Sequence, residues 1–580
     1  MKFILFLVRF LFILTGFLLS FFIMFYIFKP IFFAESLIFP YSVHPFDLCN
    51  KIPVVWKYIK LIYILCFSFS TITIFNSISS IVFKNKVNYK KKYNRKAKKL
   101  NKNLSLFIGN SFENQNPIIL SEKALYQNIL VTGTIGTGKT SSAMYPFCNQ
   151  LINYKCDNTK EKLGLLILDV KGNFYKQVIN FCTQNGRLDD LIVISLDGTI
   201  RYNPLDKPNL KPHVLANRLK EILLLFSPNN TESYWLDIVE QAIAEAIKLC
   251  RLYNNGYVTF LELHNLLTHH KYYLEKVSIL RKSFLENSLS KSQVHDLLSS
   301  LKFFESDYYS LDPKILSTLK SEIGRITNTF ISDYDIVNTF CPNKSDINFK
   351  GFKDVIKNGK IVVLNMNIGE YKNLSKIIAA YLKLDFQSEI LSQLSKNNTE
   401  IRASAFICDE YHEYVTTSDA DFFSQSREAK SINIVATQSY TSLINSLRNQ
   451  YSAKVIIQNL VNKLWFRTDD IFTIEEAQKQ IGKEDKVKIS KSVSENAEKT
   501  FYNYFTSSLN SHNSNISESI SSYINYDFIF DSNFFSSKLE TFTCLCFLSD
   551  GKNIIPPQKL QMKPYFDKPT TPKQNKYKII

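Results

Sequence analysis

Short apolar runs recur along the chain after residue 128, and segments with helical periodicity separate many of them. Each run spans only a few residues and contains no polar interruption, as in 164–169 and 191–195. Such runs are typical of strands buried on both faces of a parallel sheet. The alternation predicts a three-layer α/β domain. The strands expected in it are 128–132, 164–169, 191–195, 360–365, 404–408, 433–437 and 463–467.

A long helical stretch interrupts this alternation. Residues 213–340 show helical periodicity without a strong strand signal, and 235–249 is the clearest amphipathic helix. We therefore expect an all-α domain, 212–345, inserted into the sheet domain. The sheet domain is then divided into a first part, 105–211, and a second part, 346–566.

Two later segments have compositions that favour irregular structure. Residues 490–522 are rich in Ser and Asn and predict a mobile loop. Residues 567–580 carry Pro and Lys and predict a disordered tail. Cys544 and Cys546 form the only close pair among the ten cysteines. On a strand both would point to the same face, so we expect buried core residues and not a metal site or a disulfide.

The N-terminal region predicts a membrane hairpin over 1–83. Residues 10–28 are almost wholly apolar, and 61–83 contain no charge. Each run is close to the ~20 residues that cross a hydrocarbon core. The alternative for the first run is a signal peptide, but the small-residue cleavage site of such a peptide is missing.

The segment after this hairpin is basic. Residues 84–102 contain ten Lys or Arg and no acidic residue, so the juxtamembrane segment 84–104 is expected on the cytoplasmic side. The cell membrane would then be crossed twice, with the main body cytoplasmic. The basic segment can lie against anionic lipid or also touch nucleic acid. The net charge of +18 suits either polyanion, or serves only solubility.

The most specific chemical motif is a phosphate-binding P-loop, or Walker A motif, at 133–140, which reads G-x-x-x-x-G-K-T. Glycines let backbone N–H groups surround phosphates, Lys139 reaches the β- and γ-phosphates, and the Thr140 hydroxyl can bind Mg²⁺. A chance match is less expected in a chain with only 16 glycines. The motif predicts ATP and Mg²⁺ as ligands. The binding residues expected are Gly133, Thr134, Gly136, Gly138, Lys139, Thr140 and Ser141.

Two later strands end in residues that suit ATP hydrolysis. Asp409 follows the strand 404–408 and is expected to hold Mg²⁺, while Glu410 would orient and deprotonate the attacking water. The alternative is an ordinary strand end with two surface acids. Gln438 follows the strand 433–437 and is expected to contact the γ-phosphate.

Two basic residues leave alternatives open. Arg427 is expected either to reach the γ-phosphate of a neighbouring subunit, as a catalytic finger, or to form a surface salt bridge. Lys171 follows the strand 164–169, at the sheet edge where ligands gather, and either approaches the nucleotide or only caps the sheet.

The order of these motifs resembles the coupling proteins of type IV secretion and conjugation, the TraG/TraD group. Besides the motifs above, the resemblance rests on Tyr202-Asn-Pro-Leu205, Asn462-Lys-Leu-Trp-Phe-Arg467 and Lys563-Pro-Tyr-Phe566. One departure is Asn173, where that group usually carries an acidic residue after the Lys-Gly pair.

This resemblance implies a RecA-like P-loop ATPase that forms a homo-hexamer under the membrane and moves DNA, single- or double-stranded. It also implies relaxosome or relaxase proteins as partners of the all-α domain, and components of a secretion channel. One alternative is an FtsK-type translocase, although that type usually has more membrane spans and a C-terminal winged helix. The other is a docking receptor that does not pump.

Overall fold

The computed structural model describes residues 103–567 together with Tyr58 and Leu61, except 198, 227–232, 287, 396, 398–400, 496–501, 504–507 and 510–515. Nearly all of the predicted membrane hairpin, the basic segment up to Lys102, and the tail from residue 568 onward lie outside the described residues. Among the described residues, no helix combines the length and the apolar character needed to cross a membrane.

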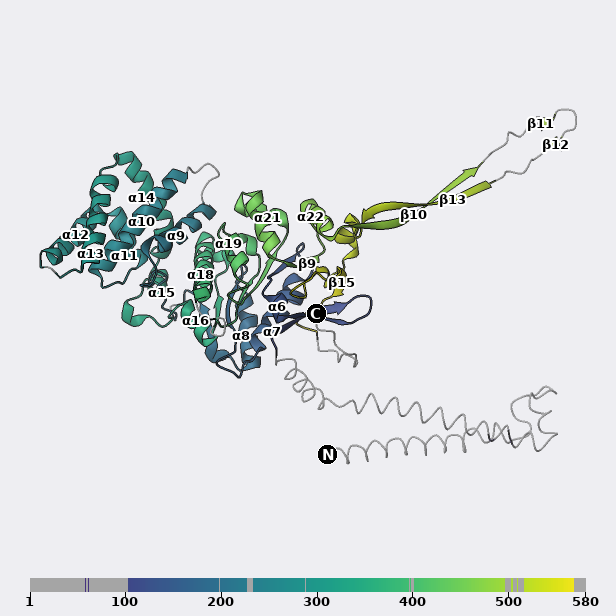
Figure 1. The fold of residues 1–580 in the computed structure, drawn as a ribbon, viewed down its shortest axis with the longest axis horizontal. Coiled ribbons are helices and arrows are strands. Elements are labelled where there is room, and N and C mark those ends of the chain that lie inside the picture. The colour runs from purple at the N-terminus through teal and green to yellow at the C-terminus, as the bar shows by residue number, and fades with distance from the viewer. Residues whose placement is uncertain are drawn as a thin grey trace, which may run out of the picture. The chain divides into compact units, whose positions relative to one another are not determined.

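An eleven-stranded sheet organises the described part of the chain, with the order β2-β1-β15-β14-β9-β3-β8-β7-β4-β6-β5 (Figure 1). All pairings from β9 to β5 are parallel. The parallel strands are β3 (Ile129–Thr132), β4 (Gly164–Leu168), β5 (Leu191–Ile194), β6 (Ile361–Leu364), β7 (Ser404–Cys408), β8 (Ser431–Thr437) and β9 (Asn462–Phe466). Each corresponds to one of the seven strands predicted from apolar runs.

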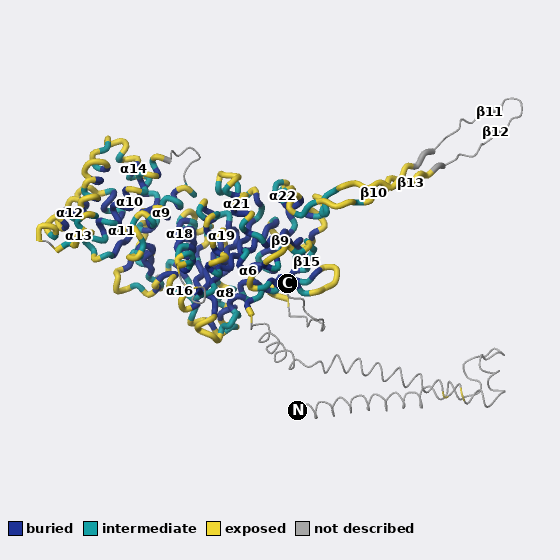
Figure 2. The backbone as a smooth tube through the Cα atoms, viewed as in Figure 1, coloured by how far each residue is buried: buried dark blue, intermediate teal, exposed yellow. Residues whose placement is uncertain are grey.

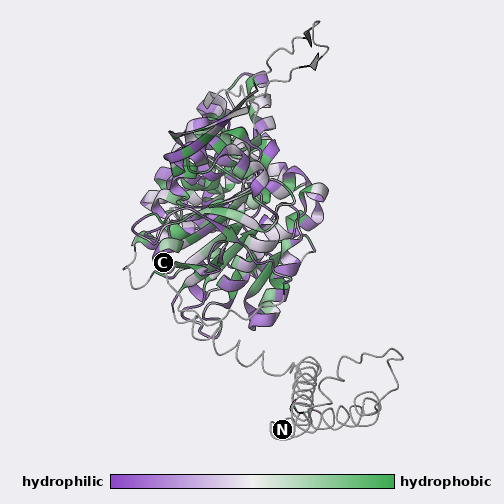
Figure 3. Cartoon of the chain, turned by 90° about the vertical axis from the view of Figure 1, so that its right-hand side faces the viewer, coloured by the Kyte–Doolittle hydropathy of each residue, from purple (hydrophilic) through white to green (hydrophobic). Residues whose placement is uncertain are grey.

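Both faces of this parallel sheet are covered, which confirms the predicted three-layer α/β arrangement. In β4, Leu165 and Ile167 join one hydrophobic core, whereas Leu166 and Leu168 join the other. The strands accordingly lie in the buried, apolar centre of Figures 2 and 3. The first core includes residues of α7 (Tyr145–Asn153) and α8 (Phe174–Asn185), and the second includes residues of α18 (Asn373–Leu391), α19 (Asp419–Gln425) and α20 (Tyr440–Leu447).

Between β5 and β6 the described residues form helices. The predicted helix 235–249 lies within α10 (Ser233–Tyr253), which packs against its neighbours in a group beside α18 (Figure 1). The others are α9 (Pro212–Phe226), α11 (Phe260–Thr268), α12 (His270–Leu285), α13 (Lys291–Lys302), α14 (Pro313–Thr327), α15 (Tyr334–Phe340) and α16 (Phe352–Asn358). Shorter or later helices elsewhere are α6 (Glu122–Leu125), α17 (Ile368–Tyr371), α21 (Gln450–Asn459) and α22 (Ile471–Ile481).

Four antiparallel strands extend the sheet beyond β9. They are β14 (Thr543–Phe547), β15 (Gln558–Gln561), β1 (Ser105–Ser111) and β2 (Pro117–Ser121). Cys544 and Cys546 lie on β14 and are buried in one core, while Leu545 between them faces another. The prediction of two buried cysteines on one face of a strand is confirmed.

The prediction of a loop over 490–522 is wrong at both ends of that range. Residues 490–495 and 516–522 belong to a long antiparallel ribbon. It pairs β10 (Lys483–Glu495) with β13 (Ile516–Phe528) and extends from the sheet domain (Figure 1), with short strands β11 (Tyr502–Asn503) and β12 (Ser508–Leu509) farther along. The register places Val487 opposite Ile524 and Lys488 opposite Tyr523. Val487 and Ile489, two positions apart in β10, carried a partial strand signal, which Lys491 at the next such position and the Ser and Asn content obscured.

A buried ion pair fixes the chain just after β7. Lys383 and Asp419 are both fully buried, with 2.6 Å between Nζ and the nearer carboxylate oxygen. The Lys383 amine also donates to the Tyr414 carbonyl at 2.7 Å, and Asp419 accepts from the Tyr411 hydroxyl and from the Thr416 N–H. The pair therefore holds the turn between β7 and α19 to α18.

Replacing Lys383 by Met should lower the free energy of unfolding by about 3–5 kcal/mol, because Asp419 would remain buried without its cation. Urea unfolding of the full chain, followed by tryptophan fluorescence, measures the loss. The matched control is Lys479→Met, since Lys479 is exposed and pairs at the surface with Glu475 and Glu476, so its loss should cost at most ~1 kcal/mol. Equal losses for the two variants would contradict the structural role given to the buried pair.

Candidate nucleotide-binding site

The P-loop joins β3 to α7, as its sequence context predicted. The helix begins as a π-helical turn, Thr140–Met144, and continues into α7. Gly136 and Gly138 have φ values of 80° and 96°, which glycine adopts without the penalty of a Cβ. A Cβ on Gly138 would also meet the Phe542 ring at 2.4 Å. The loop is thus shaped by backbone freedom and by a ring packed against it.

Lys139 turns its amine into the P-loop. Its Nζ donates to the carbonyl oxygens of Gly133 and of Thr134, the latter at 3.1 Å. Burial lowers the pKa of Lys139, and the nearby carboxylates of Glu410 and Asp409 act in the opposite direction. The ammonium group therefore lies where a phosphate would be received, with carbonyl oxygens as its present partners.

Thr140 and Asp409 come together across the site. The Thr140 hydroxyl donates to Asp409 Oδ2 at 2.7 Å, although the two residues are 269 positions apart. Asp409 is 1% exposed, and burial raises its pKa to about 6, with Asp169 and Glu410 contributing in the same direction. A buried carboxylate short of positive charge, beside a hydroxyl, fits a Mg²⁺ site of the kind found in P-loop enzymes.

Glu410 follows directly in an unusual backbone conformation. Its φ of 51° is left-handed, and the residue is 7% exposed. One carboxylate oxygen lies 3.6 Å from Lys171 Nζ and the other 3.8 Å from His412 Nδ1. The latter oxygen, Oε2, is buried and has no hydrogen-bond partner among the described residues. An acceptor in this state is suited to take a hydrogen bond from a water molecule.

Gln438 lies at the end of β8, next to the P-loop. Its carbonyl oxygen accepts a hydrogen bond from Gly133 N–H at 3.2 Å. The preceding Thr437 hydroxyl is 3.2 Å from His412 Nδ1, and burial lowers the pKa of that imidazole. The end of β8 is therefore tied to the P-loop on one side and to the turn after Glu410 on the other.

Asp169 organises the loop after β4, a role that the sequence did not assign to it. Its carboxylate accepts from the backbone N–H groups of Lys171, Asn173 and Phe174, each at 3.1 Å. These bonds close the loop and leave the Lys171 side chain directed to Glu410. Lys171 thus pairs with Glu410 at this sheet edge, and its approach to a nucleotide stays a prediction. Asn173 precedes α8 as its N-cap residue and contributes its backbone N–H to the loop.

Arg427 is not brought to the P-loop of its own chain. It is exposed in the turn before β8, whereas Gln438 follows the opposite end of that strand. Seven residues of strand separate the two edges, a length of ~20 Å. Arg427 therefore could reach a nucleotide only on another subunit.

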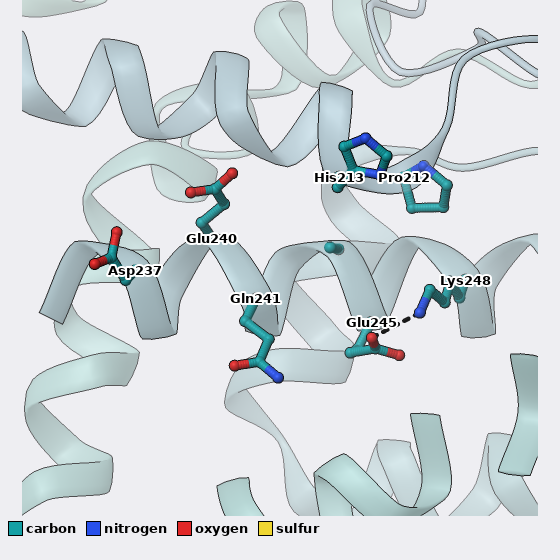
Figure 4. Close-up of a pocket in the computed structure, with 8 residues that line it drawn as sticks. Pro212, His213, Asp237, Glu240, Gln241, Glu245 and Lys248 are labelled. Carbon is teal, nitrogen blue, oxygen red and sulfur yellow. Dashed lines mark hydrogen bonds and ion pairs between the residues drawn. The ribbon is translucent and has the colours of Figure 1, made fainter. Parts of the chain in front are cut away.

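A hollow of about 300 Å³ lies on the all-α part, between α9 and α10 (Figure 4). Asp237, Glu240 and Glu245 line it together with Lys248. Lys220 is already paired with the first two acids, and Lys248 with the third. Such an acidic lining does not suit phosphate, so we do not assign a nucleotide to this hollow.

Comparison with solved structures places this arrangement in a known fold. The conjugative coupling protein TrwB, in unbound form, matches with a TM-score of 0.50 at 13% identity, over 81% of this chain and 91% of that chain. This chain shares the fold of TrwB. TrwB solved with a non-hydrolysable GTP analogue matches with a TM-score of 0.51 at 13% identity, over 81% and 92% of the two chains.

A further TrwB structure, with ADP and Mg²⁺, gives a TM-score of 0.51 at 13% identity, over 80% of this chain and 94% of that chain. No family model matches the sequence, and no curated protein does. The resemblance to coupling proteins, first seen in the order of motifs, is thus confirmed in the fold.

Proposed function

We propose that this protein is an ATP-hydrolysing motor of the conjugation and type IV secretion type. The observation that carries the proposal is the Thr140–Asp409 hydrogen bond, with the buried Glu410 Oε2 beside it, which has no hydrogen-bond partner among the described residues. A P-loop, a metal-binding pair and a free carboxylate acceptor are the parts that hydrolysis of a nucleoside triphosphate needs.

Each residue would have a distinct part in the reaction. Lys139 would leave its carbonyl partners for the β- and γ-phosphates, and Thr140 with Asp409 would hold Mg²⁺, which neutralises phosphate charge when bound. Glu410 would accept the proton of the attacking water. Gln438, fixed beside Gly133, would contact the γ-phosphate and transmit its loss to the turn at His412.

The biological role would be coupling of a DNA-processing complex to a secretion channel and transfer of DNA through a hexameric ring. The fold shared with TrwB supports this role, as do the basic charge and the order of motifs. The all-α part would receive relaxosome proteins. The apolar runs at 10–28 and 61–83 would anchor the ring to the cell membrane, with the basic segment against anionic lipid.

The central test measures phosphate release by the full-length protein with and without single- or double-stranded DNA. DNA should stimulate turnover, and Glu410→Gln should retain ATP binding but lose at least ~100-fold in rate, since a general base is removed. Lys139→Ala should lose both binding and turnover. Glu475→Gln, a change at an exposed acid of α22, is the control and should behave as wild type.

Two results would count against the proposal. If Glu410→Gln hydrolysed ATP at the wild-type rate, Glu410 would not be the general base. Turnover that ignores both kinds of DNA would favour a docking receptor in which nucleotide serves assembly.

Arg427 provides a test of the ring. If it acts on the neighbouring subunit, Arg427→Ala should bind ATP normally and lose up to ~10³-fold in hydrolysis. Arg427→Ala and Lys139→Ala subunits, each inactive alone, should regain partial activity when co-assembled, since one interface then joins an intact P-loop to an intact arginine. Arg281→Ala, at another exposed arginine, is the control. If mixed rings form but hydrolyse ATP no faster than either variant alone, Arg427 does not act on the nucleotide of a neighbouring subunit.

Membrane topology follows from the two apolar runs and the basic segment between 84 and 102. A reporter fused after Lys102 should be active only inside the cell, and one inserted within 39–47 only outside, because positive residues stay cytoplasmic. Activity of paired cytoplasmic and extracytoplasmic reporters at each position is the measurement. The opposite pattern at either position would refute the hairpin.

A further inference from the structure

A line of aromatic rings runs along the P-loop, and the motifs that define the phosphate site do not use it. It consists of Phe542, Tyr565 and Phe566, and we call it the aromatic ridge. The Phe542 ring packs against Gly138, as the predicted clash with a Cβ shows. The Phe566 ring lies 6.0 Å from Phe542 and 5.4 Å from Tyr565, so the three rings are contiguous.

The backbone of the ridge is fixed to the P-loop and its helix. Phe542 N–H donates to the Thr137 carbonyl at 3.1 Å, and the Phe542 carbonyl accepts from Met562 N–H at 2.8 Å. Tyr565 N–H donates to the Ser141 carbonyl at 2.9 Å, and its ring meets Tyr145 of α7 edge to face at 5.1 Å. Met562 and Pro564, between these bonds, are buried. The segment is therefore held in place before any ligand arrives.

The rings themselves are open. Tyr565 is 43% exposed and Phe566 is 60% exposed, although both belong to a well-anchored segment. Large aromatic side chains held on a fixed backbone offer flat apolar surface at little further entropic cost on binding. Tyr565 and Phe566 meet edge to face, with 76° between their planes, so a planar ligand can lie flat on only one of them.

The position of the ridge identifies that ligand, on the basis of the nucleotide site proposed above. In that site the γ-phosphate would lie near Lys139, Thr140 and Glu410. The α- and β-phosphates would lie at the loop around Gly138 and at the helix start at Ser141. The nucleoside must continue beyond the α-phosphate, and the ridge is what borders the loop at Gly138 and Ser141. We propose that the purine base of the bound nucleotide stacks on the face of Phe566, the more exposed ring, with Tyr565 against its edge and Phe542 supporting them.

This subsite would contact the flat face of the base and would not form hydrogen bonds with its edge. Stacking on aromatic rings tolerates different bases, since each presents a π-face. ADPNP and GDPNP, the non-hydrolysable analogues of ATP and GTP, should therefore bind the full-length protein with affinities within about tenfold of each other.

The test compares binding of ADPNP and of inorganic tripolyphosphate, both with Mg²⁺, by calorimetry on the full-length protein. Phe566→Ala should weaken ADPNP binding by about 5- to 150-fold, the range for loss of base stacking on an aromatic ring, and Tyr565→Ala should weaken it less. Tripolyphosphate has no base, so its affinity should change less than about twofold. Tyr565→Phe and Phe566→Tyr keep the ring and should bind ADPNP as wild type does.

Tyr451→Ala, at an exposed aromatic side chain of α21, is the matched control and should change neither affinity. Equal loss of ADPNP and tripolyphosphate would overturn the inference, because the ridge would then only support the P-loop. Unchanged ADPNP binding, or loss of binding together with loss of subunit assembly on a sizing column, would overturn it as well. If wild type bound neither probe, the nucleotide site itself would be wrong, a failure distinct from that of the ridge.

Discussion

The hydrogen bond between Thr140 and Asp409 is the contact on which the rest of the site depends. It joins the loop after β3 to the end of β7, two strands separated by β8 in the sheet. The carboxyl ends of parallel strands lie at the same edge of a sheet. The loops after β3, β4, β7 and β8 therefore lie close together at that edge. The tight turn at Glu410 and the carbonyl of Gln438 are fixed relative to this bond.

Buried acids outnumber the cations beside them at the P-loop. Asp169, Asp409 and Glu410 are buried near one another, and Lys139 and Lys171 are the cations beside them. Asp169 satisfies its oxygens with backbone N–H groups, burial raises the pKa of Asp409, and Glu410 Oε2 has no hydrogen-bond partner among the described residues. A divalent cation would stabilise the ionised form of Asp409, and a water molecule could donate a hydrogen bond to Glu410 Oε2.

The ribbon of β10 and β13 shows a different constraint. The register places Val487, Ile489, Ile524 and Tyr526 on one face, and all four are exposed. The opposite face carries Ser and charged residues such as Lys486 and Asp527. The pairing is thus held by backbone bonds and cross-strand contacts and not by a core, which is why its sequence kept a polar composition.

The sequence by itself determined the seven parallel strands and the P-loop, because buried strands need continuous apolar runs and phosphate binding needs Gly and Lys at fixed spacing. It also indicated Asp409, Glu410 and Gln438, since strand ends can be read locally. Only the tertiary structure decided which strand ends meet, that Lys171 faces Glu410, and that Arg427 lies at the far edge. These depend on strand order, which pairs segments hundreds of residues apart. The same holds for Phe542 and Tyr565, whose place against Gly138 and Ser141 results from the antiparallel return of β14 and β15 and leaves no local signal.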